Sequence, residues 1–323
     1  MPIDIGDSSK RVLLVGAGFS RNWGGRLAIE VWQDVFGHAA VKSRPAVIEL
    51  LRGEASFEAA LEIVRTDGAF SAEDRLALET AIADCFERMD RQFCEPNAAV
   101  SIYTINSFIG RFCPGPVGQP TGYVFSLNQD LLLERKFGTQ PDVQKLSIPG
   151  IRWQQQPPPF PAGAWPIPEA ILDDPRSNAP ILNRHFNLIK LHGSMNWRSG
   201  DGSRSMIVGG GKPASIAREP LLAWYQEVFE AVLSAGGVRL MVIGYGWSDE
   251  HVNAVIANAA KNHDLGVYFW DVSDPRGTLP SKPYGDVILK AMIGLATRPM
   301  HEVMPAPQNP QTQEYARIVT ELF

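Results

Sequence analysis

The sequence is poor in cysteine, and the three cysteines it has are scattered. They are Cys85, Cys94 and Cys113 in a chain of 323 residues. An odd number without a close pair supports neither a disulfide framework nor a four-cysteine zinc site. No run of 18 apolar residues occurs, so we expect no membrane-spanning helix. The first residues, MPIDIGDSSKR, lack the apolar stretch of a secretory signal, and we therefore expect a cytoplasmic protein.

Positive charge is also scarce. The chain has 30 basic and 35 acidic residues, which gives a net charge of −5. General nucleic-acid binders carry a basic excess, so we expect no direct nucleic-acid binding. The hydrophobic share of 45% and the charged share of 20% are ordinary for a globular protein. The length allows one large domain or two.

Short apolar runs separated by helical patterns indicate the fold class. Each run is too short for a typical helix and ends in glycine or small polar residues, as buried parallel strands do. Strands that alternate with helices predict an α/β fold, here a Rossmann-like and mainly parallel sheet flanked by helices. The predicted strands are 11–16, 123–126, 185–191, 238–244 and 266–271, and the clearest later helices are 219–235, 249–262, 284–294 and 312–322.

Residues 45–112 show apolar residues at helical spacing and no convincing strand. Ser71 followed by Asp74 resembles a capping box and predicts a helix start. We therefore predict a helical insertion subdomain at 45–112 and a Rossmann-like domain made of 1–44 and 113–323. Ten of the 25 prolines lie between 141 and 180, a pattern that favours a lid, a partner surface or a mobile linker.

The first candidate site follows the first predicted strand and consists of Gly16, Ala17, Gly18, Phe19 and Ser20. Glycines let the backbone approach a pyrophosphate, and a helix start offers amide donors. The alternative is a tight strand–helix turn without a ligand. The third glycine of a dehydrogenase fingerprint is replaced here by arginine, and no acidic residue ends the next strand. A hydride-transfer enzyme is therefore disfavoured.

Two further strands end in polar residues. Asn128 and Asp130 follow the second predicted strand, and His192 with Gly193 follows the third. An asparagine can hold a sugar hydroxyl or a water, and a histidine can act as a general base. The alternatives are helix caps for Asn128 and Asp130 and a structural hydrogen bond for His192. The remaining histidines show no ligand-like grouping with cysteine or carboxylates, so we expect no metal site.

A fourth strand end carries Gly244, Tyr245, Gly246 and Ser248, with Asp249 opening the next helix. Small residues there could admit a ribose or nicotinamide, and the alternative is a glycine-rich turn with an aspartate cap. Ligands of open α/β sheets bind at the carboxyl ends of the strands. The four strand ends therefore predict one ligand site on a shared sheet edge.

In this order, VGAGFS, FSLNQD, KLHGS and VIGYGWSDEHVN resemble the sirtuin-like family in its prokaryotic branch, over roughly residues 11–275. The resemblance implies that Gly16, Ala17, Gly18 and Ser20 bind the pyrophosphate. It matches Asn128 and Asp130 to the family's QN-x-D element, with leucine in place of glutamine, and His192 to the HG histidine. Gly244 and Ser248 match a later glycine-serine element only loosely.

One departure from the family is decisive for function. Deacylase sirtuins place two CxxC pairs after the HG histidine to build a zinc ribbon, and no cysteine follows Cys113. The resemblance to zinc-free members implies an NAD⁺-cleaving effector of bacterial anti-phage defence. It implies NAD⁺ as the substrate, a homo-oligomer, and a HerA-type ATPase or another sensor chain as a possible partner.

The implied reaction is cleavage of the nicotinamide–ribose bond to nicotinamide and ADP-ribose, without a metal. Asn128 would position the ribose or the attacking water, and His192 would act as the general base. Gly16 to Ser20, Asp130, Gly193, Gly244, Tyr245 and Ser248 would bind the cofactor. The competing interpretations are a protein-lysine deacylase of the same fold, an inactive module that senses NAD⁺ or ADP-ribose, and a structural subunit docked through 141–180.

Overall fold

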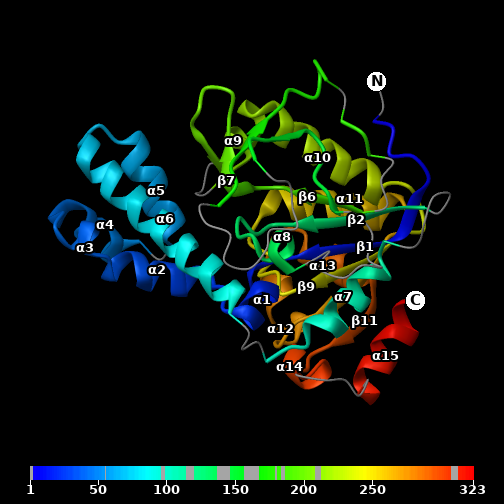
Figure 1. The fold of residues 1–323 in the computed structure, drawn as a ribbon. Coiled ribbons are helices and arrows are strands. Elements are labelled where there is room, and N and C mark those ends of the chain that lie inside the picture. The colour runs from blue at the N-terminus through cyan, green and yellow to red at the C-terminus, as the bar shows by residue number, and fades with distance from the viewer. Residues whose placement is uncertain are drawn as a thin grey trace.

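A seven-stranded parallel sheet forms the centre of the molecule, and the Rossmann-like α/β prediction is confirmed. The computed structural model describes residues 3–54, 56–95, 99–113, 120–136, 146–155, 167–178, 180–182, 186–207, 212–306 and 312–323. The strand order is β11-β10-β9-β1-β2-β6-β3 (Figure 1). The strands are β1 (Ser8–Val15), β2 (Thr121–Ser126), β3 (Leu146–Ser147), β6 (Phe186–Lys190), β9 (Arg239–Ile243), β10 (Gly266–Trp270) and β11 (Met292–Ala296).

Helices cover both faces of this sheet. Phe229 of α10 packs on Phe125 of β2, with ring centroids 4.7 Å apart. Phe108 of α7 packs on Trp270 of β10, on the opposite face, because Trp270 lies one residue beyond the register row of Phe125. The helices beside the sheet are α1 (Ala17–Ser20), η1 (Arg21–Trp23), α7 (Ile102–Gly110), α8 (Leu132–Lys136), α9 (Lys212–Arg218), α10 (Pro220–Leu233), α11 (Glu250–Asn262), α12 (Pro275–Thr278), η2 (Leu279–Ser281), α13 (Gly285–Lys290), α14 (Met300–Val303) and α15 (Gln313–Leu322).

Five helices form an arm that projects from the sheet (Figure 1). The long helix α6 packs against α2, α3 and α5, and its predicted capping box is present, with Ser71 Oγ accepting from the Asp74 amide at 3.1 Å. The helical arm therefore starts before residue 45, whereas α7 lies against the sheet. The helices of the helical arm are α2 (Ala28–Gly37), α3 (Ala39–Lys42), α4 (Pro45–Gly53), α5 (Phe57–Thr66) and α6 (Ala72–Cys94).

A second, four-stranded sheet was not predicted from the sequence. Its order is β4-β5-β7-β8, and it mixes parallel and antiparallel pairs. Much of the proline-rich segment 141–180 lies outside the described residues, but its described part supplies β4 and β5. Strands β7 and β8 are antiparallel neighbours and form a hairpin. The strands are β4 (Ile151–Trp153), β5 (Ala170–Leu172), β7 (Gly193–Arg198) and β8 (Arg204–Met206).

The predicted helix at 284–294 is wrong in its second half. Helix α13 ends at Lys290, and Met292–Ala296 forms the edge strand β11. A Cβ on Gly294 would lie 2.2 Å from the Tyr268 ring, so glycine lets β11 pair closely with β10. A short apolar run does not distinguish helix from strand by periodicity, and this pairing decides between them. The predicted helix at 312–322 is confirmed as α15.

Two expected absences can be compared with the described part of the chain. No helix there is both long and apolar enough to cross a membrane. Nor is there a zinc ribbon, because the three cysteines are free and lie in α6 and after α7.

Candidate functional site

A cavity of about 910 Å³ opens at the carboxyl ends of β1, β2, β9 and β10. The sheet edge forms one wall, and the helical arm contributes the facing wall through Phe57, Glu58, Phe86 and Met89. Of the predicted site residues, those that line the cavity are Gly16, Ala17, Gly18, Asn128, Asp130, His192, Gly244, Tyr245 and Ser248. The four predicted strand ends therefore contribute to one cavity.

The first and fourth strand ends are packed directly on each other. The Gly16 amide donates to the Ile243 carbonyl and the Gly18 amide to the Gly244 carbonyl, both at 2.9 Å. A Cβ on Gly16 would lie 2.6 Å from the Gly244 oxygen. Gly244 itself has a φ of +62°, which favours glycine. The backbone contact between the two turns therefore requires these glycines by itself.

This packing uses amides that the sequence interpretation assigned to a pyrophosphate. The Phe19 amide also donates within the fold, to the Gly16 carbonyl at 2.9 Å. The Phe19 side chain lies in the core against Trp23, with ring centroids 5.3 Å apart, and does not line the cavity. Positive charge comes instead from side chains on separate segments, which the motifs did not identify. They are Arg21, Arg26, Lys212 and Arg298.

Asn128 joins the second strand end to the first. Its Nδ2 donates to the Gly16 carbonyl and to Ser20 Oγ, both at 2.9 Å. An amide nitrogen carries two hydrogens, so both donors are used. The side chain is buried to 8% exposure and still lines the cavity. Asn128 therefore joins two strand ends, and the cap of α8 is Asp130 instead.

Asp130 does cap a helix. Its Oδ1 accepts from the Leu132 amide at 3.0 Å, at the start of α8. Burial raises the pKa of Asp130, and Lys190 opposes this effect. Ser20 is 2% exposed and does not line the cavity; its hydroxyl contacts the Asn128 amide instead.

Lys190 anchors the turn beneath His192. Its Nζ donates to Glu134 Oε1 and to Ser194 Oγ, both at 2.8 Å, and to the Asp130 carbonyl. Both charged groups of the Lys190–Glu134 pair are 1% exposed. A buried pair with additional hydrogen bonds fixes geometry strongly because separation would leave an unpaired charge. The KLHGS segment is thereby held against α8 and the FSLNQD segment.

His192 is 1% exposed and lies at the floor of the cavity. Burial lowers its pKa to about 3, against the opposing effect of the Asp249 carboxylate. Its Nε2 lies 3.2 Å from Nε2 of His251. His192 is therefore a neutral imidazole at neutral pH, in a hydrogen-bonded pair with His251.

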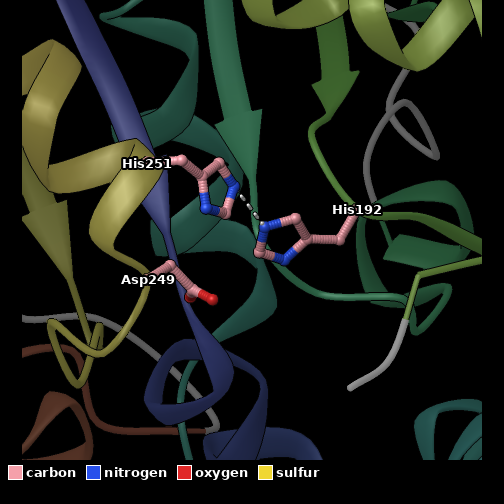
Figure 2. Close-up of side chains that lie close together, drawn as sticks. All are labelled: His192, Asp249 and His251. Atoms are coloured by element: carbon pink, nitrogen blue, oxygen red, sulfur yellow. Dashed lines mark hydrogen bonds between the residues drawn. The ribbon is translucent and has the colours of Figure 1, made fainter. Parts of the chain in front are cut away.

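The expectation that the other histidines form no ligand-like grouping is wrong for His251. Nitrogen and oxygen atoms of His192, Asp249 and His251 all lie within 4.8 Å of one another. Figure 2 shows the two rings facing each other with the Asp249 carboxylate beside them. In the sequence, Asp249 and His251 are two positions apart at the start of α11. Nothing in the sequence indicates that His192, from another segment, lies beside them. His185 lies outside the described residues.

Asp249 occupies the cap position of α11, but its side chain does not cap the helix. Its Oδ1 accepts from Lys212 Nζ at 2.7 Å, and Lys212 also contacts Glu58 Oε2 at 3.2 Å. Burial disfavours both charges, yet the attraction raises the pKa of Lys212 and, with other nearby positive charge, lowers that of Asp249. This ion pair connects α5 of the helical arm to the site.

Tyr245 and Gly193 support the site in different ways. Tyr245 is buried, and its hydroxyl accepts from the Asp249 amide at 3.1 Å and donates to Asn253 at 3.0 Å. It therefore fixes the first turn of α11. Gly193 has a φ of +73° and packs on the Ser205 carbonyl of β8. It is not among the residues lining the cavity.

Comparison with protein-family models finds no match, and a search of curated proteins finds no similar sequence.

Proposed function

We propose that the protein hydrolyses the nicotinamide–ribose bond of NAD⁺ and yields nicotinamide and ADP-ribose. The observation that supports this most is the meeting of Asn128 and His192, from neighbouring strand ends, in one cavity with the Gly16–Gly18 turn. Ligand cavities typically have a volume of about 300–1,000 Å³, so a volume of about 910 Å³ suits a ligand as large as a dinucleotide. The proposed role as an anti-phage effector rests on the sirtuin-like resemblance.

The chemistry demands little from the protein at the leaving group. The C1′–N bond breaks and its electron pair neutralises the pyridinium, so nicotinamide leaves without an added proton. The ribose carbon passes through an oxocarbenium-like state, which a water molecule attacks. The protein must orient the ribose, place that water and accept one proton from it.

Asn128 is suited to orienting the ribose or the water. Because both of its N–H groups are held by Gly16 and Ser20, its Oδ1 faces a ligand as a fixed acceptor. A ribose hydroxyl or the attacking water would donate to this oxygen. Preorganised polar groups of this kind lower a barrier because they need no rearrangement during the reaction.

His192 would accept the proton that the attacking water loses. It is unprotonated at neutral pH, because burial lowers its pKa to about 3. Such a low pKa makes a weak base. A weak base is sufficient when the electrophile is an oxocarbenium-like carbon, and the proton then passes to solvent.

The pyrophosphate would be bound mainly by side chains. Arg26 and Arg298 line the cavity, and the amides of Gly16 and Gly18 are already bonded within the fold. Arginine can pair with phosphate oxygens through two N–H groups at once. A homo-oligomer or a HerA-type sensor chain would switch the activity, and both remain proposals from the family resemblance.

The test is a product assay with NAD⁺ by chromatography, on the protein alone and with the product of the neighbouring gene. We expect nicotinamide and ADP-ribose in equal amounts, and at least a roughly hundredfold slower reaction for Asn128→Ala and His192→Ala. Asn262→Ala and His263→Ala, at the end of α11 and outside the cavity, are the matched controls.

Unchanged rates in both site variants would overturn the assignment. Cleavage that requires an acetylated peptide would favour the deacylase instead. Binding of NAD⁺ without turnover, alone and with the neighbouring chain, would favour the sensing module.

A further inference from the structure

The grouping of His192, His251 and Asp249 is not explained by glycosidic-bond cleavage alone. Hydrolysis as proposed needs one base, but three potential metal ligands lie within 4.8 Å of one another (Figure 2), and two of them, His192 and Asp249, line the cavity. They come from two segments far apart in sequence. Their donor atoms are two imidazole nitrogens and one carboxylate oxygen, a set that suits zinc-class transition ions better than calcium or magnesium.

The spacing of the two nitrogens matches a tetrahedral metal. Two Zn–N bonds of about 2.0–2.1 Å at a tetrahedral angle place the nitrogens about 3.3–3.4 Å apart. The observed Nε2–Nε2 distance is 3.2 Å. The two nitrogens are thus spaced closely enough to share one ion.

The two imidazole rings already hold their Nε2 atoms together. His192 is 1% exposed, and one proton lies between the two Nε2 atoms, which are 3.2 Å apart. A metal ion that replaces this proton would bind both nitrogens. His251 is partly exposed, so its proton can move from Nε2 to Nδ1 through water when Nε2 binds an ion.

Asp249 can complete three protein ligands. Lys212 occupies its Oδ1, which leaves the second oxygen of the carboxylate for a metal. The cavity supplies water for a fourth position, the arrangement found in open zinc sites. The Lys212 charge opposes a cation here, so the affinity is tuned by the same ion pair that links the helical arm to the site.

We propose that His192, His251 and Asp249 bind a divalent zinc-class ion at the edge of the cavity, where His192 and Asp249 line it. The ion takes the Nε2 lone pair of His192, and it therefore inhibits NAD⁺ cleavage. The binding claim stands on the geometry alone, whereas the inhibition rests on the proposed function.

The first test is a titration of chelator-treated full-length protein with Co²⁺, followed by visible absorption. We expect the intense spectrum of a tetrahedral site in the wild type. His251→Ala should weaken binding by more than about tenfold, because loss of even an outer partner costs 10–100-fold. Lys212→Gln should strengthen binding, an effect opposite in sign to any loss of structure. His263→Ala is the control and should bind as the wild type does.

Equal Co²⁺ titrations of the wild type and folded His251→Ala, or no tetrahedral spectrum in the wild type, would overturn the site. Folding of each variant is checked by circular dichroism. The second test adds Zn²⁺ to the NAD⁺ assay, where we expect inhibition that a chelator reverses. Cleavage that persists in the Zn²⁺-loaded protein would overturn the inhibition. If NAD⁺ is not cleaved at all, the proposed function fails while the Co²⁺ titration still decides the metal site.

Discussion

Asn128 and Asp130 lie two positions apart and have different roles. Asp130 caps α8, whereas Asn128 donates both amide hydrogens to the Gly16–Ser20 segment. The sequence left helix capping open for both, because asparagine and aspartate are equally good caps. Only their contacts distinguish the residue that stabilises a helix from the one that joins two strand ends.

At the same scale, Gly244 should tolerate no side chain. A Cβ there would lie 2.4 Å from the Phe19 amide nitrogen, and the φ of +62° adds strain. We expect Gly244→Ala to lower the free energy of unfolding by about 2–4 kcal/mol, measured by urea denaturation. Gly246→Ala is the matched control in the same turn, where an added Cβ meets nothing within 4 Å. It should change stability by less than about 1 kcal/mol. Equal losses in both variants would contradict the explanation.

His192 should make the protein sensitive to acid. Its pKa is about 3 in the folded protein and about 6.5 when unfolded. Between these values only the unfolded chain binds the proton, so stability falls as pH decreases below about 6.5, by up to roughly 1.4 kcal/mol per pH unit. His192→Asn should make this decline shallower in urea denaturation at pH 7 to 4.5 with a chelator present. His263→Asn should keep the wild-type slope, and an unchanged slope in His192→Asn would count against a buried neutral ring.

At the scale of elements, one buried ion pair connects the helical arm to the sheet. Nη2 of Arg135 on α8 lies 2.5 Å from Oδ2 of Asp90 on α6, and the two side chains are 1% and 0% exposed. Removing one partner of a buried pair leaves an uncompensated charge. We expect Asp90→Ala to cost about 3–5 kcal/mol in thermal or urea unfolding.

The control variant for Asp90→Ala is Asp84→Ala, also on α6. Asp84 Oδ2 lies 3.0 Å from His38 Nε2, but the Asp84 side chain is 47% exposed. Exposed pairs contribute about 0–1 kcal/mol, so this variant should unfold nearly as the wild type does. A double variant, Asp90→Leu with Arg135→Met, should recover much of the loss because no charge remains buried. A double variant as unstable as Asp90→Ala would show that packing, not charge, dominates there.

The elements that the sequence predicted are those with a strong local pattern. The central strands are buried on both faces and appear as continuous apolar runs, and the capping box at Ser71 starts α6 as expected. The second sheet was missed because β4 and β5 are three residues long and sit among prolines. Such strands are specified by their partners rather than by periodicity.

At the scale of the whole molecule, the reactivity of the three cysteines measures how tightly the chain is packed. Burial raises the pKa of Cys85 to about 12, with Asp34 acting in the same direction, and burial also raises that of Cys113. The thiolate is the reactive form, so both should be inert in the native protein. Cys94 is only partly buried.

We therefore expect one of the three thiols to react with an aromatic disulfide reagent in the folded protein, and all three in denaturant. The Cys94→Ser variant should show no rapid reaction until it unfolds. Rapid labelling of two or three thiols in native wild-type protein would contradict the packing of α6 and α7 against the rest of the molecule.

The sequence by itself determined the α/β class, the positions of the main strands along the chain and the polar residues at their carboxyl ends. These features follow from local patterns, because a strand buried on both faces and the turn after it are formed by consecutive residues. The tertiary structure alone decided that the arm closes one wall of the cavity and that His251 and Asp249 meet His192. It also decided that the glycine-rich turns pack on each other, so that their Gly16 and Gly18 amides are bonded within the fold. Such contacts join segments dozens of residues apart, and no periodicity in one segment encodes its distance from another.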